Sequence, residues 1–253
     1  MRRTQTSYKH AFFSLMLAAT EAAAGEAQIA VAANFATPAK RLADQFAQTT
    51  GHKLAISAGS TGKFYAQIRN GAPFDVFLSA DNATPRRMEE EKLAMPGSRF
   101  TYAVGRLALW SPMPGMVDDK AEVLRKAAFK RLAIANPKLA PYGAAAQQTM
   151  EKLGVWPVLQ QKLVQGENIA QTFQFVSSGN ADLGFVALSQ IQERGNAIAG
   201  SHWLVPPSMY APLRQDAALL ARGEANAAAR QFLDYLRSPS ARELIRSYGY
   251  DLP

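Results

Sequence analysis

Residues 29–62 read IAVAANFATPAKRLADQFAQTTGHKLAISAGSTG, and this stretch predicts a strand, a helix and a second strand in succession. Ile29–Ala32 is a short apolar run typical of a buried strand. Thr37-Pro38 predicts a helix start with threonine as the N-cap and proline at the first helical position, and Gly51 predicts its end. Lys53–Ser57 predicts the second strand, and the glycine-flanked loop 58–62 leads into another helix.

The same alternation of strands and helices continues along the chain. Further strands are expected at residues 76–78, 106–110, 132–135, 183–186 and 217–220, and further helices at 81–92, 118–129, 143–153, 168–176, 224–237 and 240–247. We therefore predict an α/β fold in which helices cover parallel sheets. The length of 253 residues suits one large domain or two smaller ones.

The N-terminus, residues 1–27, is predicted to be an export signal with cleavage near residues 24–27. Arg2, Arg3 and Lys9 form a positive segment, an apolar core follows at 11–19, and small residues come next. The apolar core is too short for a permanent transmembrane helix, which needs about 20 residues. The alternative is an amphipathic first helix. The export signal predicts a soluble, periplasmic protein.

Composition excludes several kinds of chemistry. The chain has no cysteine, so disulfides, thiolate catalysis and Cys-ligated metals are excluded. It has three dispersed histidines, of which His52 is expected to face solvent, and no HExxH or GxSxG motif. Asp75 and Asp81 fit a turn and a helix cap, with a paired general acid and base as the alternative. We predict no catalytic residue, no cofactor and no enzymatic activity.

The charge balance favours small anions over nucleic acids. The formal net charge is +8, and the loss of residues 1–24 leaves 25 basic and 19 acidic residues, or +6. These charges are not clustered, since Arg86-Arg87 is followed at once by Glu89–Glu91. No basic stripe is interleaved with aromatic residues, so we predict no nucleic-acid binding. A mild positive field assists the capture of small anions.

Polar residues follow the ends of the predicted strands, where helices begin. They are Asn34, Ser60, Thr61 and Tyr142. Ligands of open α/β sheets bind at the carboxyl ends of strands, where helix N-termini attract anions without lysine or arginine. Each residue has a plainer alternative as a turn, cap or half-buried residue. The nearby Lys63 does not complete a phosphate-binding P-loop, because Phe64 follows it, and we expect it to be solvated.

Several motifs resemble the periplasmic molybdate-binding protein family of ABC transporters. These motifs are VAANF at 31–35, SAGSTGK at 57–63, GAPFDVFLSAD at 71–81, Asn136-Pro137 with Tyr142-Gly143, and DLGFV at 182–186. The similarity runs in order across nearly the whole mature chain, as far as Tyr248-Gly249-Tyr250.

The resemblance implies a type II periplasmic binding protein fold, with a ligand cleft between two lobes joined by two crossing strands. Lobe I would comprise residues 28–105 and 215–253, and lobe II residues 106–214. The residues that match the family's ligand positions contact oxyanion oxygens and not the metal itself: Asn34, Ser60, Thr61, Tyr142 and, through its backbone N–H, Ile169. Some members carry a tyrosine where Ala187 stands here, so the phenol of Tyr142 is expected to come from the opposite wall.

The function implied is capture of molybdate, and of tungstate, with delivery to an inner-membrane ABC permease by cleft closure. We expect a monomer. One alternative is another oxyanion, such as sulfate, phosphate or a small carboxylate, on the same scaffold. A second alternative is an enzyme or a solute-sensing module of the same fold.

Overall fold

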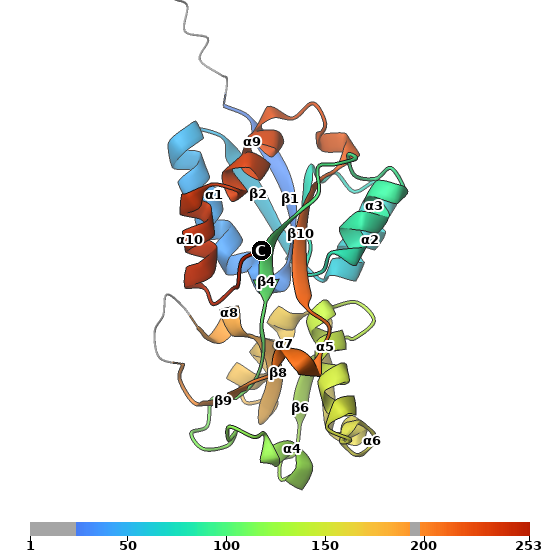
Figure 1. Ribbon diagram of the computed structural model, residues 1–253, viewed down its shortest axis with the longest axis vertical. Helices are drawn as coiled ribbons and strands as arrows, with labels where there is room; N and C mark the ends of the chain where they lie inside the picture. The colour runs from blue at the N-terminus through green and yellow to red at the C-terminus, as the bar shows by residue number, and fades with distance from the viewer. Residues whose placement is uncertain (1–23, 193–197) are drawn as a thin grey trace, which may run out of the picture.

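The computed structural model describes residues 24–192 and 198–253, which form two α/β lobes (Figure 1). The first 23 residues of the predicted export signal lie outside this range. The first lobe is built on a five-stranded sheet in the order β2-β1-β3-β10-β4. Its strands are β1 (Glu26–Ala32), β2 (Lys53–Gly59), β3 (Val76–Leu78), β4 (Phe100–Gly105) and β10 (Leu213–Leu219).

Helices cover both faces of this first sheet. They are α1 (Ala36–Thr50), α2 (Thr61–Arg69), α3 (Ala83–Glu90), α9 (Ala227–Leu236) and α10 (Pro239–Ser247). Alternate residues of β1 point to opposite faces. Ile29 therefore packs in one core with Phe46 of α1 and Phe232 of α9, while Ala30 packs in another with Phe64 of α2. Figure 1 shows α1, α9 and α10 on one side of the sheet and α2 and α3 on the other.

The second lobe repeats this plan with the strand order β7-β6-β8-β5-β9. Its strands are β5 (Leu107–Ser111), β6 (Leu132–Ala135), β7 (Leu163–Gly166), β8 (Leu183–Ala187) and β9 (Ser201–Leu204). Its helices are α4 (Glu122–Lys126), α5 (Pro141–Lys152), α6 (Trp156–Leu159), α7 (Ile169–Ser177) and α8 (Leu188–Ile191).

The predicted α/β fold with helix-covered sheets is confirmed. The predicted parallel pairing holds for β1 with β2 and β3 and for β6 with β7 and β8, but neither sheet is wholly parallel. β10 runs antiparallel to β3 and β4, and β5 runs antiparallel to β8 and β9. The prediction missed β4, β7 and β9. The missed strands β4 and β9 are the second antiparallel partners of β10 and β5, and the regular alternation suggested crossover connections throughout.

Three local predictions also require correction. The first helix begins at Ala36, after the 3₁₀ turn η1 (Ala33–Phe35), so Thr37 lies in its first turn and is not its N-cap. The helix predicted at 118–129 is limited to α4, because Ala121 and Ala127 have left-handed φ angles of 54° and 48° at its two ends. His52 is buried, where its Nδ1 accepts a hydrogen bond from Gly25 N and its ring stacks on Phe46.

The chain passes between the lobes twice, once at Arg106 between β4 and β5, and once along residues 205–212 ahead of β10. Figure 1 shows β4 and β10 side by side as they descend toward the second lobe. Their pairing is irregular, since Gln215 opposes Ala103 while Asp216 opposes Thr101. Tyr102 is therefore the extra residue of a β-bulge, a feature that redirects side chains near functional sites.

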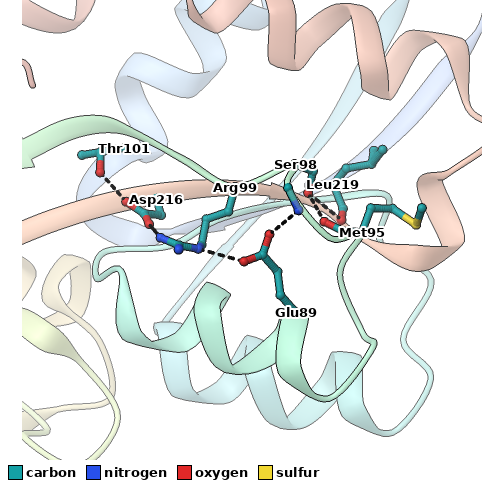
Figure 2. A network of polar contacts seen from close by, with 8 residues as sticks. Glu89, Met95, Ser98, Arg99, Thr101, Asp216 and Leu219 are labelled. Carbon is teal, nitrogen blue, oxygen red and sulfur yellow. Dashed lines mark hydrogen bonds and ion pairs between the residues drawn. The ribbon is translucent and has the colours of Figure 1, made fainter.

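A buried carboxylate fixes these two strands within the first lobe (Figure 2). Asp216 is fully buried, and its oxygens accept hydrogen bonds from Arg99 Nη1 at 2.6 Å and Thr101 Oγ1 at 2.7 Å. Arg99 Nε also donates to Glu89 of α3 at 3.0 Å. A buried charge is tolerated only when it is paired and hydrogen-bonded. The Arg99 guanidinium therefore links α3 to the strand pair and compensates the charge of Asp216.

Arg99→Met is expected to lower the free energy of unfolding by about 3 kcal/mol, because it leaves the Asp216 carboxylate buried without its cation. Urea denaturation of the purified variants measures this. Arg125→Met is the matched control, since Arg125 forms an exposed pair with Glu122, and such pairs contribute about 0–1 kcal/mol. Equal stability of the two variants would contradict the assigned role of Arg99.

Candidate functional site

The five residues that sequence analysis selected line one cavity between the lobes. The cavity is small, with a volume of about 10 Å³ for the centres of water-sized spheres. Its walls come from the carboxyl ends of β1 and β2 and the beginnings of α2, α5 and α7. The lining residues are Ala32, Ala33, Asn34, Gly59, Ser60, Thr61, Ala80, Ala140, Pro141, Tyr142, Asn168 and Ile169. Within the described ranges, this lining contains no charged side chain and no histidine.

Strand register explains why these chain segments meet. Ala32 pairs with Gly59 at the ends of β1 and β2, so η1 and α2 begin at the same edge of the first sheet. In the second lobe, Ala135 pairs with Gly166, which brings the loops before α5 and α7 together in the same way. The first N–H groups of each helix have no acceptor within the helix and carry a positive partial charge. The cavity therefore favours a negative ligand.

Ser60 and Thr61 each leave a hydroxyl hydrogen available at the start of α2. Ser60 Oγ is buried and has no hydrogen-bond partner among the described residues, and it does not cap the helix. Thr61 Oγ1 accepts a hydrogen bond from Ala80 N at 3.2 Å, which leaves its own hydrogen free. A buried hydroxyl without a partner costs about 1–3 kcal/mol. The Ser60 hydroxyl is thus suited to bind a ligand that supplies the missing acceptor.

Asn34 lines the cavity, but its side-chain N–H groups are already used inside the protein. Its Nδ2 donates to Gln215 Oε1 at 2.9 Å and to the Tyr250 hydroxyl at 3.0 Å. Its carbonyl oxygen accepts hydrogen bonds from Tyr250 and from Ser189 of α8. The donor that Asn34 has left for a ligand is its main-chain N–H, in the first turn of η1.

Tyr142 brings a phenol to the cavity from the second lobe. Its hydroxyl accepts a hydrogen bond from Gln215 Nε2 at 3.2 Å. Burial raises the pKa of Tyr142 well above its ordinary value, so the hydroxyl keeps its hydrogen at all physiological pH values. Gly105 leaves room for this arrangement, because a Cβ atom there would collide with the Tyr142 hydroxyl. The Tyr142 phenol is therefore a neutral donor.

Ile169 offers its main-chain N–H at the start of α7. Asn168 caps this helix, and its Oδ1 accepts hydrogen bonds from Ala170 N at 2.9 Å and Gln171 N at 3.0 Å. The cap thus satisfies the second and third N–H groups of the helix and leaves the first, that of Ile169, for a ligand. Ala187 lies at the end of β8, and it is not among the lining residues of the cavity.

Direct contacts across the cleft hold the lobes together on either side of the cavity. Gly62 N donates to Leu139 O at 2.9 Å. Lys63 of α2 forms an ion pair with Glu167, which precedes the α7 cap. The Lys63 side chain is 43% exposed, so it lies at the rim, as expected, and not in the cavity. These contacts describe a closed arrangement of the lobes.

Sequence reasoning missed the buried residues behind the cavity wall, above all Gln215, Tyr102 and Tyr250. A signal for the first was present, because the polar pair Gln215-Asp216 directly precedes the apolar run 217–220 that was predicted as a strand. The alternative of an acid–base pair finds no support, since Asp75 accepts a hydrogen bond from Gln28 N and Asp81 from Thr84 N. Residues 24–192 and 198–253 contain no cluster of three or more potential metal-ligating side chains, and none of their helices is long and apolar enough to span a membrane.

Two α/β lobes, two chain crossings and a cavity of neutral donors between them define a solute-binding protein of the periplasmic type. The model of the bacterial extracellular solute-binding protein family matches residues 27–251. The chain belongs to this family.

Relatives within the family are close over their full lengths. The chain is 56% identical over 236 residues to the molybdate-binding protein ModA of Azotobacter vinelandii, covering 93% of this chain and 94% of the relative. It is 52% identical to the molybdate-binding protein ModA of Rhodobacter capsulatus, covering 92% and 90% of the two chains. The solved periplasmic molybdate-binding protein of Azotobacter vinelandii superimposes with a TM-score of 0.88 at 43% identity, covering 90% of this chain and 99% of the other.

Ser60→Ala is expected to leave the stability of the ligand-free protein unchanged or to raise it, because the substitution removes a buried hydroxyl that has no partner. Thermal unfolding without added anions measures this. Ser111→Ala is the matched control, since the buried Ser111 Oγ donates to Asp182 O at 2.7 Å and its loss is expected to cost about 1–2 kcal/mol. A Ser60 variant as destabilised as the control would show that the hydroxyl has an internal partner.

Proposed function

We propose that this protein binds molybdate, and also tungstate, outside the cytoplasm and delivers it to an ABC permease. The observation that carries the proposal is the cavity, which is lined by hydroxyl and N–H donors and contains no charged side chain among the described residues. The names of the two most similar relatives reported above, both molybdate-binding proteins, support the choice of ion.

The chemistry of the donors suits a tetrahedral dianion. Such an ion loses its hydration on every side when the lobes close, and hydrogen bonds to a charged acceptor return about 1.5–3 kcal/mol each. Uncharged donors fixed by helix starts and caps also set the size of the ion, because a smaller anion cannot reach all of them at once. Molybdate and tungstate are nearly equal in size and larger than sulfate, which favours them over the sulfate or phosphate alternative.

Each proposed ligand contact has a structural basis. We assign the main-chain N–H of Asn34, the hydroxyl and N–H of Ser60, the N–H and hydroxyl of Thr61, the hydroxyl of Tyr142 and the N–H of Ile169 to the oxygens of the ion. The groups come from both lobes, so the complete set exists only when the cleft is closed. Closure is then a signal that a permease can recognise. No cofactor or direct metal ligand enters this proposal.

The proposed cellular context follows from the sequence. Residues 1–27 serve as a cleaved export signal, and the mature chain acts in the periplasm as a monomer. We divide it into lobe I, residues 28–105 and 215–253, and lobe II, residues 106–214. Residue 105 is the last of β4, and residue 214 is the second of β10, two residues after the segment 205–212 that connects the lobes.

Molybdate and tungstate are expected to raise the melting temperature, while sulfate and phosphate at the same concentration have little effect. A ligand at one hundred times its Kd stabilises the folded state by about 2.7 kcal/mol. Isothermal titration with the four oxyanions gives the affinities directly. A protein that binds sulfate or phosphate more tightly than molybdate would contradict the proposal and favour the alternative oxyanion.

Ser60→Ala is expected to weaken molybdate binding by about 1.5–3 kcal/mol, because it removes a donor to a charged oxygen. Lys63→Met is the matched control at the rim of the same helix turn. Its exposed ion pair with Glu167 contributes about 0–1 kcal/mol. Isothermal titration of both variants tests whether the ion is bound without a countercharge. A larger loss of affinity for Lys63→Met than for Ser60→Ala would show that the lysine contacts the ion.

A further inference from the structure

We propose that Gln215 is a positioning residue, whose amide joins the ligand-facing residues of both lobes and orients the Tyr142 hydroxyl as a donor to the bound anion. This inference rests on the proposed function, because it concerns how the same cavity presents its donors. Gln215 does not line the cavity itself. It lies behind the wall, fully buried, in the middle of β10.

The β-bulge brings Gln215 and its partners together. Because Tyr102 is the extra residue opposite Gln215 and Asp216, its side chain turns toward the same interior as Gln215. Its single hydroxyl hydrogen is shared between Ser79 O at 3.0 Å and Gln215 Oε1 at 3.1 Å. Asp216, the next residue, is held on the other face by Arg99 and Thr101, as Figure 2 shows. The backbone that carries Gln215 is thus fixed on both sides.

The hydrogen bonds of Gln215 assign a direction to its amide. Its Oε1 accepts from Asn34 Nδ2 at 2.9 Å and shares the single Tyr102 hydroxyl hydrogen with Ser79 O. The amide nitrogen therefore faces the Tyr142 hydroxyl and donates to it at 3.2 Å. A tyrosine hydroxyl has one hydrogen, and an amide N–H cannot accept it. The hydrogen of Tyr142 consequently stays available for an oxygen of the ligand.

This arrangement also connects the two lobes. In the first lobe, Asn34 lies in η1 and Tyr102 within β4, while Tyr142 lies on α5 of the second lobe. The bond from Gln215 to Tyr142 therefore spans the cleft beside the crossing strand. One amide holds Asn34 in its turn and, when the lobes are closed, supplies the hydrogen bond that orients the phenol. Gln215 thereby makes the geometry of the donors depend on closure.

Isothermal titration with molybdate on four forms of the full mature chain tests the proposal: the parent, Gln215→Leu, Tyr142→Phe and the double variant. We expect each single substitution to weaken binding roughly tenfold, in line with the loss of one hydrogen bond to a charged acceptor. The affinity of the double variant is expected to be no more than about threefold below that of the weaker-binding single variant, because both substitutions remove the same donor. Gln148→Leu is the matched control, since Gln148 accepts from Ala211 N outside the cavity.

Gln215→Glu separates positioning from a merely structural role. A carboxylate accepts the Tyr142 hydrogen and brings a negative charge behind the anion, so binding at pH 8 is expected to fall below that of Gln215→Leu. Burial raises the pKa of an introduced carboxyl. Protonation as the pH is lowered from 8 to 5.5 should therefore recover affinity in this variant alone, while parent and Gln215→Leu keep a constant ratio.

The outcomes distinguish this proposal from the function on which it rests. A parent that binds none of the oxyanions overturns both. A parent that binds molybdate, with Gln215→Leu binding equally well or with additive losses in the double variant, overturns the role of Gln215 alone. If Gln215→Leu does not fold, as judged by circular dichroism, Gln215→Met and the pH series of Gln215→Glu decide the matter. A pH-independent ratio between Gln215→Glu and the parent would also overturn it.

Discussion

The arrangement of this protein depends on main-chain N–H groups that lie near one point and have no partner among the residues that the structure describes. Ordinarily a folded chain satisfies nearly all such groups. Here two strand pairings end in register, Ala32 with Gly59 and Ala135 with Gly166, and each ends where helical turns begin. The beginnings of η1, α2, α5 and α7 therefore meet at a small cavity. Caps such as Asn168 satisfy some of the N–H groups and leave selected ones free.

The absence of charge in the described lining has an energetic consequence. A lysine in the cavity would attract any anion, whereas fixed dipoles and neutral hydroxyls stabilise a bound ion only when its oxygens fit their positions. Lys63 and Glu167, which stand near lining residues in the sequence, form an ion pair with each other at the rim. Attraction over long distances is then left to the net positive charge of the whole chain. The neutral donors of the cavity thus select among anions, while the net charge of the whole chain attracts them.

The parts of the site that are local in sequence could be predicted, and the parts that depend on distant pairing could not. Ser60 and Thr61 stand in a loop between a strand and a helix, so neighbouring residues already indicate donors there. Asn34 was expected near the ligand, and it lines the cavity, but its amide bonds Gln215 and Tyr250, which are 181 and 216 residues away in sequence. No local pattern in the sequence contains that information.

The antiparallel course of β10 also depends on pairing between segments that are distant in sequence, and it has a functional effect. A parallel strand would need a crossover before it joined the sheet, whereas β10 returns directly from the second lobe between β3 and β4. Neighbouring residues of a strand point to opposite faces. Asp216 is thereby anchored to the first lobe by Arg99, while Gln215 reaches Asn34 and Tyr142 behind the cavity. β10 enters the first lobe from the second and is fixed there by Asp216. The adjacent Gln215 can thus hold the donor residues Asn34 and Tyr142, which come together when the lobes close.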